Sequence, residues 1–445
     1  MKRNRALSLL VVMLIMVTWF MSGCSKEATK TSQSGDSSKD VVAEDSTEGD
    51  SEATPAKEEQ EQITLRFFHY QGEAQAAYET VFKAYEEQHP NVKIEFEFLN
   101  SDNYNATLQA RIATDDCPDI VGLRPGKALA IPLAEAGYLE DVTDQVCVSD
   151  MTEGELKTCS LEGKVYGVPT DQAYICTYYN KKIFSDLGLK VPTTWAEFLS
   201  ACDTIKKAGI TPISLGYKDS WVTQLAHFAI VPSTIYKENM NFDDELYAGT
   251  KKFNGEEWQK AFGMLQGLID NGYVTKNLMS TSYDQQLAGF ANGDAAMMIM
   301  GSWAVSLMKD LNPDLDFGLF ITPASDDGVN WISASVGGML GVSANSPNKE
   351  AAIDFLNYFI GNDEVYAQYL KDTNNLSARV SVIADSDPHL QELSKQVTGS
   401  YMFLDANWPT GVQDVLFKVM QEVAMGTSIS DGLDQMDAIW QEKTK

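Results

Sequence analysis

The sequence lacks the short motifs that many enzyme active sites carry. It contains no H-E-x-x-H, no G-x-S-x-G and no G-x-x-x-x-G-K-[ST], the signatures of zinc proteases, serine hydrolases and P-loop nucleotide-binding proteins. The four histidines, His69, His89, His227 and His389, are isolated from one another. A site that combines a histidine with a metal or with a nucleophile is therefore not indicated, and we expect no catalytic residue, no metal and no cofactor.

Cysteine is scarce as well. The six cysteines include no C-x-x-C pair, so neither a zinc site nor a disulfide framework is indicated. Cys147 and Cys159 are close enough in sequence to form a bridge, and this alternative stays open. Cys176 and Cys202 have apolar neighbours and are predicted to be core thiols.

Positive charge is also in short supply. The chain has 34 Lys and Arg against 63 Asp and Glu, a formal net charge of −29. Nucleic acid would be repelled by this charge, and a basic membrane-binding patch is not indicated. Acidity alone also serves solubility, so it does not identify a ligand.

One long apolar run is present, and it lies at the N-terminus. Three basic residues among the first five precede the run Leu7–Phe20, which ends in Met21-Ser22-Gly23-Cys24. This pattern predicts a secretory signal peptide over residues 1–23, since the run is short and wrongly flanked for a membrane span. Small residues before Cys24 resemble the lipobox of bacterial lipoproteins, which implies a lipidated, palmitate-bearing N-terminal cysteine. A cleaved signal with a chance cysteine is the alternative. Removing the signal would remove three positive charges, from −29 to −32.

The stretch after Cys24 is typical of a tether. Residues 25–61 are mainly small, polar or charged, and Val41 and Val42 are their only large apolar residues. Such a segment cannot bury enough apolar surface to offset its ordering entropy. We therefore expect residues 24–61 to be a disordered acidic linker that holds the folded part away from the membrane.

The chain after the linker has about 380 residues, enough for two domains of about 150 residues each. Strands and helices alternate along its first part, which is typical of an α/β domain with a mainly parallel sheet. The alternation of Val92–Phe98 predicts a half-buried strand. The expected elements of this part are strands at Ile63–Tyr70, Val92–Phe98 and Asp119–Leu123, a helix with the stripe Tyr78, Val81, Phe82 and Tyr85, and a helix at Tyr104–Ala113.

A second α/β region follows. Thr194-Trp195-Ala196-Glu197 is a capping box, and Ser346-Pro347 predicts a helix with proline at its first position. The expected strands are Ala173–Tyr179, Ile210–Leu215 and Ala295–Met300, and the expected closing helices are Val412–Met425 and Leu433–Trp440.

Several segments, in order, resemble the family-1 extracellular solute-binding proteins of ABC importers, the carbohydrate-binding group that includes maltose-binding-like proteins. The family often has glycine and a small residue where this chain has Asp116 and Cys117. Each segment alone is weak evidence for the family, whereas the whole set in this order, together with a lipobox, is specific evidence for it. The segments are Ile112–Ile120, Gly163–Pro169, Tyr178–Lys181, Val191–Trp195, Phe290–Met297, Gly301–Trp303, Gly337–Gly338 and Ser346–Phe355.

The resemblance implies an α/β, periplasmic-binding-protein-like type II fold, in which two α/β lobes are joined by a hinge that the chain crosses several times. Ligand would be enclosed between the lobes by hinge closure. We place the crossings near Asp171–Tyr174, Trp331–Val336 and Arg379–Ile383. The expected lobes are residues 62–172 with 335–380, and 173–334 with 381–445.

Ligands of open α/β sheets lie beyond the carboxyl ends of the strands. This rule selects residues that follow the predicted strands, and the resemblance adds the crossings. Polar side chains there would pair with sugar hydroxyls, although the carboxylates could equally be solvated loop residues. The polar and glycine candidates are His69, Gln71, Gly72, Glu73, Asp102, Arg124, Asp171, Gln172, Gly337, Gly338 and Arg379.

Aromatic residues would pack against the flat C–H face of a sugar ring. Trp303 matches the tryptophan of the family's Gly-x-Trp motif, and Trp408 more loosely resembles an aromatic of the C-terminal cleft wall. Trp221 is a further candidate wall, with a place in the core as its alternative. Trp258 lies on a helix stripe and is expected in the core.

Together these patterns predict a lipid-anchored receptor on the extracellular face of the cell membrane, as in a Gram-positive bacterium. It would be a non-catalytic monomer that captures a sugar or oligosaccharide and delivers it to the transmembrane subunits of an ABC permease. It would touch the membrane only through its anchor. Two alternatives stay open: a surface glycoside hydrolase that uses a pair of the many carboxylates, and a receptor for another polar solute.

Overall fold

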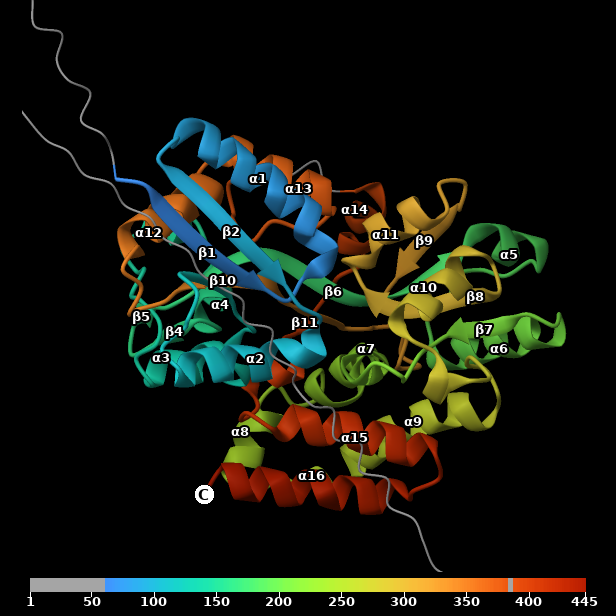
Figure 1. Cartoon of the computed structure of the whole chain (residues 1–445). Helices are drawn as coiled ribbons and strands as arrows, with labels where there is room; N and C mark the ends of the chain where they lie inside the picture. The colour runs from blue at the N-terminus through green and yellow to red at the C-terminus, as the bar shows by residue number, and fades with distance from the viewer. Residues whose placement is uncertain (1–60, 383–386) are drawn as a thin grey trace, which may run out of the picture. The chain divides into compact units, whose positions relative to one another are not determined.

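In the described part of the chain, nine strands form the main mixed sheet, in the order β2-β1-β3-β10-β6-β8-β7, with β11 beside β10 and β9 beside β6 (Figure 1). The structure, a computed structural model, describes residues 61–382 and 387–445, with the side chains of Ser101 and Asp102 left aside. The predicted signal peptide, Cys24 and all but the last residue of the predicted linker lie outside the described residues. The strands of this sheet are β1 (Ile63–His69), β2 (Val92–Phe98), β3 (Ile120–Gly122), β6 (Val168–Asn180), β7 (Thr211–Ser214), β8 (Ala295–Gly301), β9 (Phe317–Phe320), β10 (Ile332–Val342) and β11 (Ser400–Tyr401).

Helices cover the sheet and alternate with its strands (Figure 1). A separate two-stranded sheet pairs β4 (Ser160–Leu161) with β5 (Lys164–Val165). Within residues 61–382 and 387–445, no helix has both the length and the apolar character needed to cross a bilayer. The helices are α1 (Gln75–Gln88), α2 (Ser101–Ala113), α3 (Ala130–Glu135), α4 (Glu153–Lys157), α5 (Lys181–Asp186), α6 (Trp195–Lys207), α7 (Leu225–Val231), α8 (Phe242–Tyr247), α9 (Glu256–Asp270), α10 (Tyr283–Ala291), α11 (Ala304–Leu311), α12 (Lys349–Phe359), α13 (Asp363–Thr373), α14 (Pro388–Ser394), α15 (Val412–Ala424) and α16 (Ile429–Lys443).

The first α/β region forms largely as its hydrophobic pattern predicts. β1 pairs in parallel with β2 and with β3, and α1 buries the predicted stripe of Tyr78, Val81, Phe82 and Tyr85. The next neighbour, β10, is antiparallel to β3, so the sheet is mixed rather than mainly parallel. The alternation expected in β2 is incomplete, because β2 is an edge strand and Phe96 is 41% exposed.

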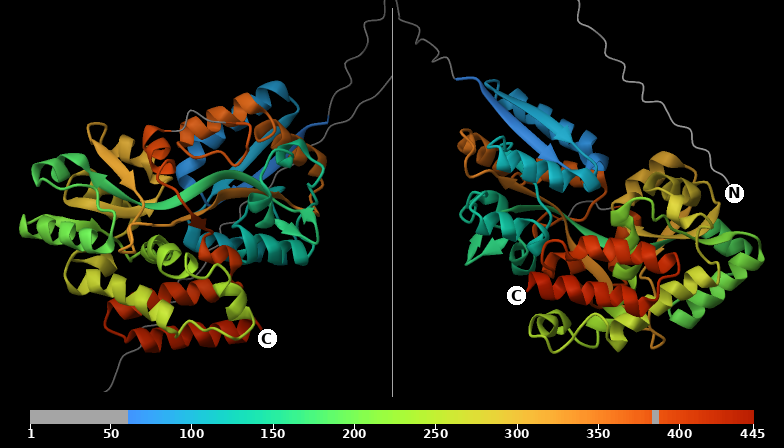
Figure 2. Two further views of the ribbon diagram at one scale, coloured as in Figure 1. Left: turned by 180° about the vertical axis from the view of Figure 1, so that it is seen from behind. Right: turned by 60° about the horizontal axis from the view of Figure 1, so that its bottom comes forward.

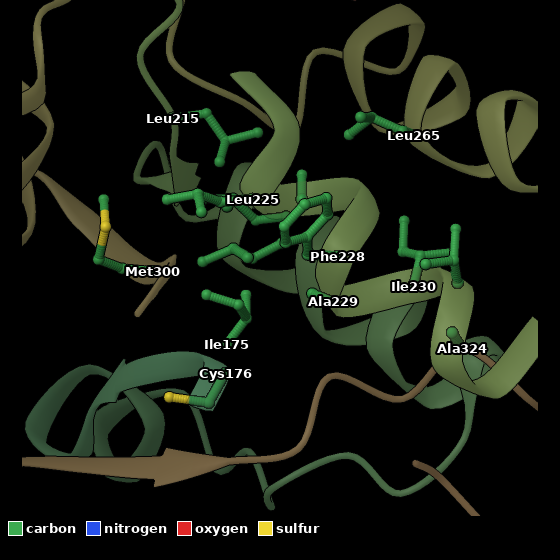
Figure 3. Close-up of a cluster of buried hydrophobic side chains, with 14 of the residues drawn as sticks. Ile175, Cys176, Leu215, Leu225, Phe228, Ala229, Ile230, Leu265, Met300 and Ala324 are labelled. Carbon is green, nitrogen blue, oxygen red and sulfur yellow. The ribbon is translucent and has the colours of Figure 1, made fainter. Parts of the chain in front are cut away.

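Buried apolar side chains form two clusters. The smaller cluster lies between the strands β1 to β3 and helices that include α1, α12 and α13. The larger cluster includes β8, α7, α9, α15 and α16, and Figure 3 shows ten labelled members of it, among them Leu225 and Phe228 of α7. The two C-terminal helices, α15 and α16, lie side by side in both Figure 1 and Figure 2.

Two long strands connect the two clusters. Val168 at the start of β6 belongs to the smaller cluster, and Ile175 further along belongs to the larger one. The antiparallel partner β10 returns from Ile332 in the larger cluster to Val336 in the smaller one. The chain therefore passes between the clusters where two of the three crossings were expected. The third was expected near Arg379–Ile383, next to residues 383–386, which lie outside the described residues.

Local sequence signals predicted the start of one helix correctly and the start of another incorrectly. Thr194 and Glu197 form the predicted capping box of α6. The helix expected at Pro347 instead begins at Lys349 as α12. The Ser346 hydroxyl accepts a hydrogen bond from the Asn348 N–H at 2.9 Å, so these residues form a turn before the helix.

All five cysteines of the described part are free thiols. Cys147 and Cys159 are both buried and do not form the bridge that their spacing allowed. Cys176 and Cys202 are fully buried, as predicted for core thiols.

Candidate functional site

A cavity lies where residues that follow β1 and β3 face residues of the larger cluster. It contains about 740 Å³ of space that is not filled by atoms, part of it open to solvent. It is lined by Tyr70, Gln71, Glu73, Arg124, Pro125, Trp221, Gln224, Leu225, Phe228, Tyr283, Trp303, Val336, Gly337, Phe403 and Asp405.

One wall comes from the loops after β1 and β3. The Tyr70 hydroxyl donates toward the carbonyls of Leu123 and Gly337, at 3.3 and 3.4 Å. The Arg124 guanidinium lies over the Tyr70 ring, 5.0 Å from its centroid, a distance at which a cation is attracted to a ring face. The carboxyl-end rule for parallel strands therefore located this wall.

The opposite wall is aromatic. Trp303 follows β8, Trp221 lies in the short helical turn before α7, and Tyr283 begins α10. The Trp221 ring centroid lies 5.0 Å from that of Tyr283 and 6.3 Å from that of Trp303. Trp221 and Trp303 are only partly buried and line the cavity, so Trp221 is placed at the wall rather than in the core interior.

Three polar atoms of the lining are buried and have no hydrogen-bond partner within the described part. They are Gln71 Oε1, Arg124 Nε and Asp405 Oδ1. A buried polar atom without a partner costs about 1–3 kcal/mol. Because all three residues line one cavity, a polar ligand there would supply the missing partners.

The two carboxyl groups of the lining are destabilised in their charged form. Glu73 is exposed where it faces the cavity, yet the protein around it raises the pKa of its carboxyl to about 7, and Asp171 adds to this effect. Asp405 is 8% exposed. Burial raises the pKa of Asp405, and the positive charge of Arg124 opposes that shift.

Gly337 and Gly338 are explained by close approach rather than by a left-handed backbone. A Cβ at Gly337 would lie 2.4 Å from Asp171 Oδ1. At Gly338 it would lie 2.5 Å from Thr170 Oγ1 and 2.6 Å from Gln71 Oε1. Gly337 lines the cavity, whereas Gly338 lies behind its lining residue Gln71.

Asp171 supports the cavity from behind. Its Oδ1 accepts a hydrogen bond from the Gly338 N–H at 2.6 Å, and its other oxygen accepts one from the Asn375 side chain. Asp171 is 1% exposed, and burial raises the pKa of its carboxyl to about 6. Gln172 points to a second cavity, beside Tyr174 and Ser335, and donates to Glu155. The structure therefore does not bring either residue into the lining of the first cavity.

His69 is a buried support and not part of the lining. Its Nδ1 accepts from the Gln71 N–H at 3.0 Å, which orients the loop that carries Gln71. Burial lowers the pKa of His69 to about 3. His69 ends strand β1, lies packed against Phe67 and Tyr78, and does not line this cavity, where the sequence had placed it.

Trp408 and Arg379 also lie away from the cavity. Trp408 is 1% exposed, and its ring packs against Phe253 and Trp258 in the larger cluster. Trp408 therefore does not line this cavity, where the sequence had placed it. Arg379 is paired with Asp363 at 2.8 Å and with Asp150 at 3.5 Å, so it secures the chain after α13 and is not available to a ligand.

The remaining candidates are Gly72 and Asp102. Gly72 is exposed at the start of a short helical turn and does not line the cavity. Asp102 falls in the first turn of α2, and its side chain lies outside the described part of the structure.

Sequence reasoning missed several lining residues. Gln224, Tyr283, Phe403 and Asp405 all come from segments of the larger cluster that do not follow a predicted strand. Asp405 lies in a short helical turn, Leu404–Asn407. The only signal near Asp405 in the sequence was the candidate Trp408, three residues later. That signal selected Trp408 rather than Asp405.

No group of His, Cys, Asp and Glu within residues 61–382 and 387–445 has the arrangement of a metal site. The cavity offers hydrogen-bonding groups, one cation, carboxyl groups and flat aromatic faces. This combination can bind a polar molecule that also has an apolar face.

Comparison with known proteins gives one consistent result. The family model of the bacterial extracellular solute-binding proteins matches residues 70–366. The multiple sugar-binding protein of Streptococcus mutans is 26% identical, over 86% of this chain and 91% of its own length. The melibiose/raffinose/stachyose-binding protein MelE of Bacillus subtilis is 26% identical, over 77% of this chain and 80% of its own length. A solved chitin oligosaccharide binding protein superposes with a TM-score of 0.78 at 26% identity, covering 86% of this chain and 99% of that one.

Proposed function

The chain belongs to the bacterial extracellular solute-binding protein family, and from this membership we propose that it captures a sugar or oligosaccharide and delivers it to the permease of an ABC importer. The fold is the two-lobed type II fold of periplasmic binding proteins, with two α/β lobes and a hinge that the chain crosses more than once. Relatives named for binding several sugars, or melibiose, raffinose and stachyose, support a saccharide as the ligand.

One observation carries the choice of ligand. The same cavity is lined by three residues with buried polar atoms that lack partners, and by two partly exposed indoles, those of Trp221 and Trp303. A saccharide has hydroxyl groups for the first and a flat C–H face for the second. Gln71, Glu73 and Arg124 on one side, and Trp221, Trp303 and Asp405 on the other, would then contact it.

Closure of the two lobes would enclose the ligand. The lobes we propose are residues 62–172 with 335–380, and 173–334 with 381–445. The antiparallel strands β6 and β10 run from one hydrophobic cluster to the other. The pairing of these two strands is irregular between Val336 and Met339, and such an irregularity bends the strand that carries it. The ligand would bias an existing equilibrium between open and closed forms, and the permease would receive the closed form.

We also propose the location and the anchor. Residues 1–23 would be a lipoprotein signal peptide, Cys24 the lipidated residue, and residues 24–61 the tether on the extracellular face of a Gram-positive membrane. The folded part would act as a monomer without catalysis. Family members are binding proteins rather than enzymes, and this supports a receptor over a glycoside hydrolase.

The proposal is tested by titration calorimetry of the full chain against a panel of neutral mono- and oligosaccharides, with X-ray scattering in parallel. We expect at least one saccharide to bind and to reduce the radius of gyration, because ligand closes the lobes. Product analysis after long incubation should show the saccharide intact. A panel that neither binds nor compacts the protein, or a saccharide that is cleaved, contradicts the proposal.

A further inference from the structure

We propose that the cavity selects saccharides that carry a protonated amino group over their neutral counterparts. This inference rests on the proposed sugar-binding function and narrows it to amino sugars, with neutral sugars and acidic sugars as the outcomes that would overturn it.

The charges of the lining are the first argument. Two carboxyl groups, those of Glu73 and Asp405, face one guanidinium, that of Arg124. None of the three forms an ion pair within 4.0 Å with any described residue. The positive charge of Arg124 acts on Asp405, so these two offset each other across the cavity. Glu73 is left without a cation.

The surroundings of Glu73 strengthen this imbalance. Three titratable groups interact electrostatically with Glu73. They are Asp171 behind the cavity, the Tyr70 hydroxyl on the same side and the Tyr283 hydroxyl on the opposite wall. None of these supplies a positive charge. Accordingly the pKa of Glu73 is raised to about 7, since the protein around its carboxyl displaces water and the like charge of Asp171 adds to this effect. A ligand cation beside Glu73 would replace the missing counter-charge.

An unpartnered atom points to the same ligand chemistry. Asp405 is only 8% exposed, lines the cavity, and its Oδ1 has no hydrogen-bond partner among the described residues. A carboxylate oxygen accepts hydrogen bonds only, so its partner must be a donor. An ammonium group has three donors, whereas a hydroxyl has one. A saccharide with amino groups therefore satisfies an acceptor-rich cavity better than its hydroxyl counterpart.

The aromatic wall adds a second attraction. Tyr283 lies electrostatically close to Glu73, and its ring is 5.0 Å from that of Trp221. A cation bound at Glu73 would therefore lie near aromatic rings, whose faces attract cations. A carboxylate together with aromatic rings is a suitable site for an ammonium group. An acidic sugar could meet Arg124, but it would add a third negative charge to the cavity.

The test uses calorimetry on the full chain with matched saccharides that differ at one substituent. Each set has the same ring and length and bears a hydroxyl, an acetylamino or a free amino group at C2, in the glucose and galactose series from one to four units. Glucuronate and galacturonate complete the panel. Titrations are made at a pH where the sugar amine is protonated. The variants are E73Q and D405N, with E79Q on the exposed side of α1 as the matched control, and each is checked for an unchanged unfolding midpoint.

We expect the amino form of the best-binding set to bind about tenfold more tightly than its hydroxyl and acetylamino forms, a difference of about 1.4 kcal/mol. E73Q should reduce this ratio to below about threefold, and D405N should reduce it as well, whereas E79Q should leave it unchanged. The preference for amino sugars is overturned if a neutral or acidic form binds as tightly as the amino form or more tightly. It is also overturned if the ratio of affinities is unchanged in both E73Q and D405N. Neither result contradicts the proposed function as a sugar receptor. If no saccharide of any kind binds, the receptor function itself fails.

Discussion

Trp303 and Trp408 belong to the same half of the molecule but have opposite surroundings. Trp303 follows β8, is partly exposed and lines the cavity with Trp221. Trp408 is 1% exposed and is enclosed by Phe253 and Trp258. The same side chain is thus a ligand surface in one place and a packing element in the other. What separates the two roles is whether protein covers the ring face, which depends on segments far away in the sequence.

Buried polar atoms without hydrogen-bond partners also differ between the larger cluster and the cavity. Trp258 Nε1 and both ring nitrogens of His227 are buried and have no partner within the described residues, and neither residue lines the cavity. Gln71, Arg124 and Asp405 also carry buried atoms without partners, but these three residues line a cavity that a ligand can enter. Unpaired polar atoms therefore indicate binding only where a cavity adjoins them.

The largest effect is expected for Trp408→Ala. Loss of this buried ring leaves a void in the larger cluster, and we expect the free energy of unfolding to fall by about 3–5 kcal/mol. Chemical denaturation monitored by circular dichroism measures it. Trp195→Ala, which removes a partly exposed ring beside Phe198, is the control and should cost clearly less. If Trp408→Ala loses no more stability than Trp195→Ala, the ring of Trp408 does not contribute to the core more than a partly exposed ring does.

A smaller effect on a different quantity is expected for Trp303→Ala. Stability should change less than in Trp408→Ala, because the ring is partly exposed. Affinity for the bound saccharide should fall by about 30-fold, or about 2 kcal/mol, as for an aromatic residue at the centre of a binding site. Calorimetry gives the affinity and denaturation the stability. Unchanged affinity in this variant and in Trp221→Ala would show that the indoles do not contact the ligand.

The smallest effect, counted per pH unit, is expected for the pH dependence of stability. It tests whether the region around His227 is closed to water. Burial lowers the pKa of His227 from 6.5 to about 3. Between these values the unfolded chain binds a proton that the folded protein excludes, so the contribution of His227 to stability is lost as pH falls. We expect the stability of wild type relative to His227→Gln to fall by about 1.4 kcal/mol per pH unit below about pH 6, levelling near pH 3.

Denaturation of both proteins over this pH range measures that difference. Taking the difference removes the contributions of other groups, including Asp171, whose raised pKa acts in the opposite sense. His89→Gln, at a ring 35% exposed, is the control. A flat difference between wild type and His227→Gln would show that water or a polar partner reaches the His227 ring.

Much of the fold was predictable because it rests on local patterns. The stripe of α1, the capping box at Thr194 and Glu197, and the buried run of β8 all formed where the sequence placed them. The start of α12 was misplaced, because the Ser346 hydroxyl engages Asn348 instead of allowing a helix to start at Pro347. The mixed sheet was not predictable, since strand direction depends on partners distant in the sequence.

About half of the proposed site followed from the sequence, and the reason is topological. Gln71, Glu73 and Arg124 line the cavity because they follow β1 and β3, whose carboxyl ends meet at one edge. Tyr283 and Asp405 line it only because α10 and the turn at Leu404–Asn407 pack there. No pattern near either residue carries that information.

By itself, the sequence determined the hydrophobic periodicity of its elements, its excess of negative charge and its family, because these depend on residue type, order and spacing. Tertiary structure alone decided that Trp408 is enclosed, that Arg379 is already paired, and that Asp405 faces the cavity. The physical reason is that burial and unmet hydrogen bonds are properties of a side chain's neighbours in space. Those neighbours come from segments that only the folded chain brings together.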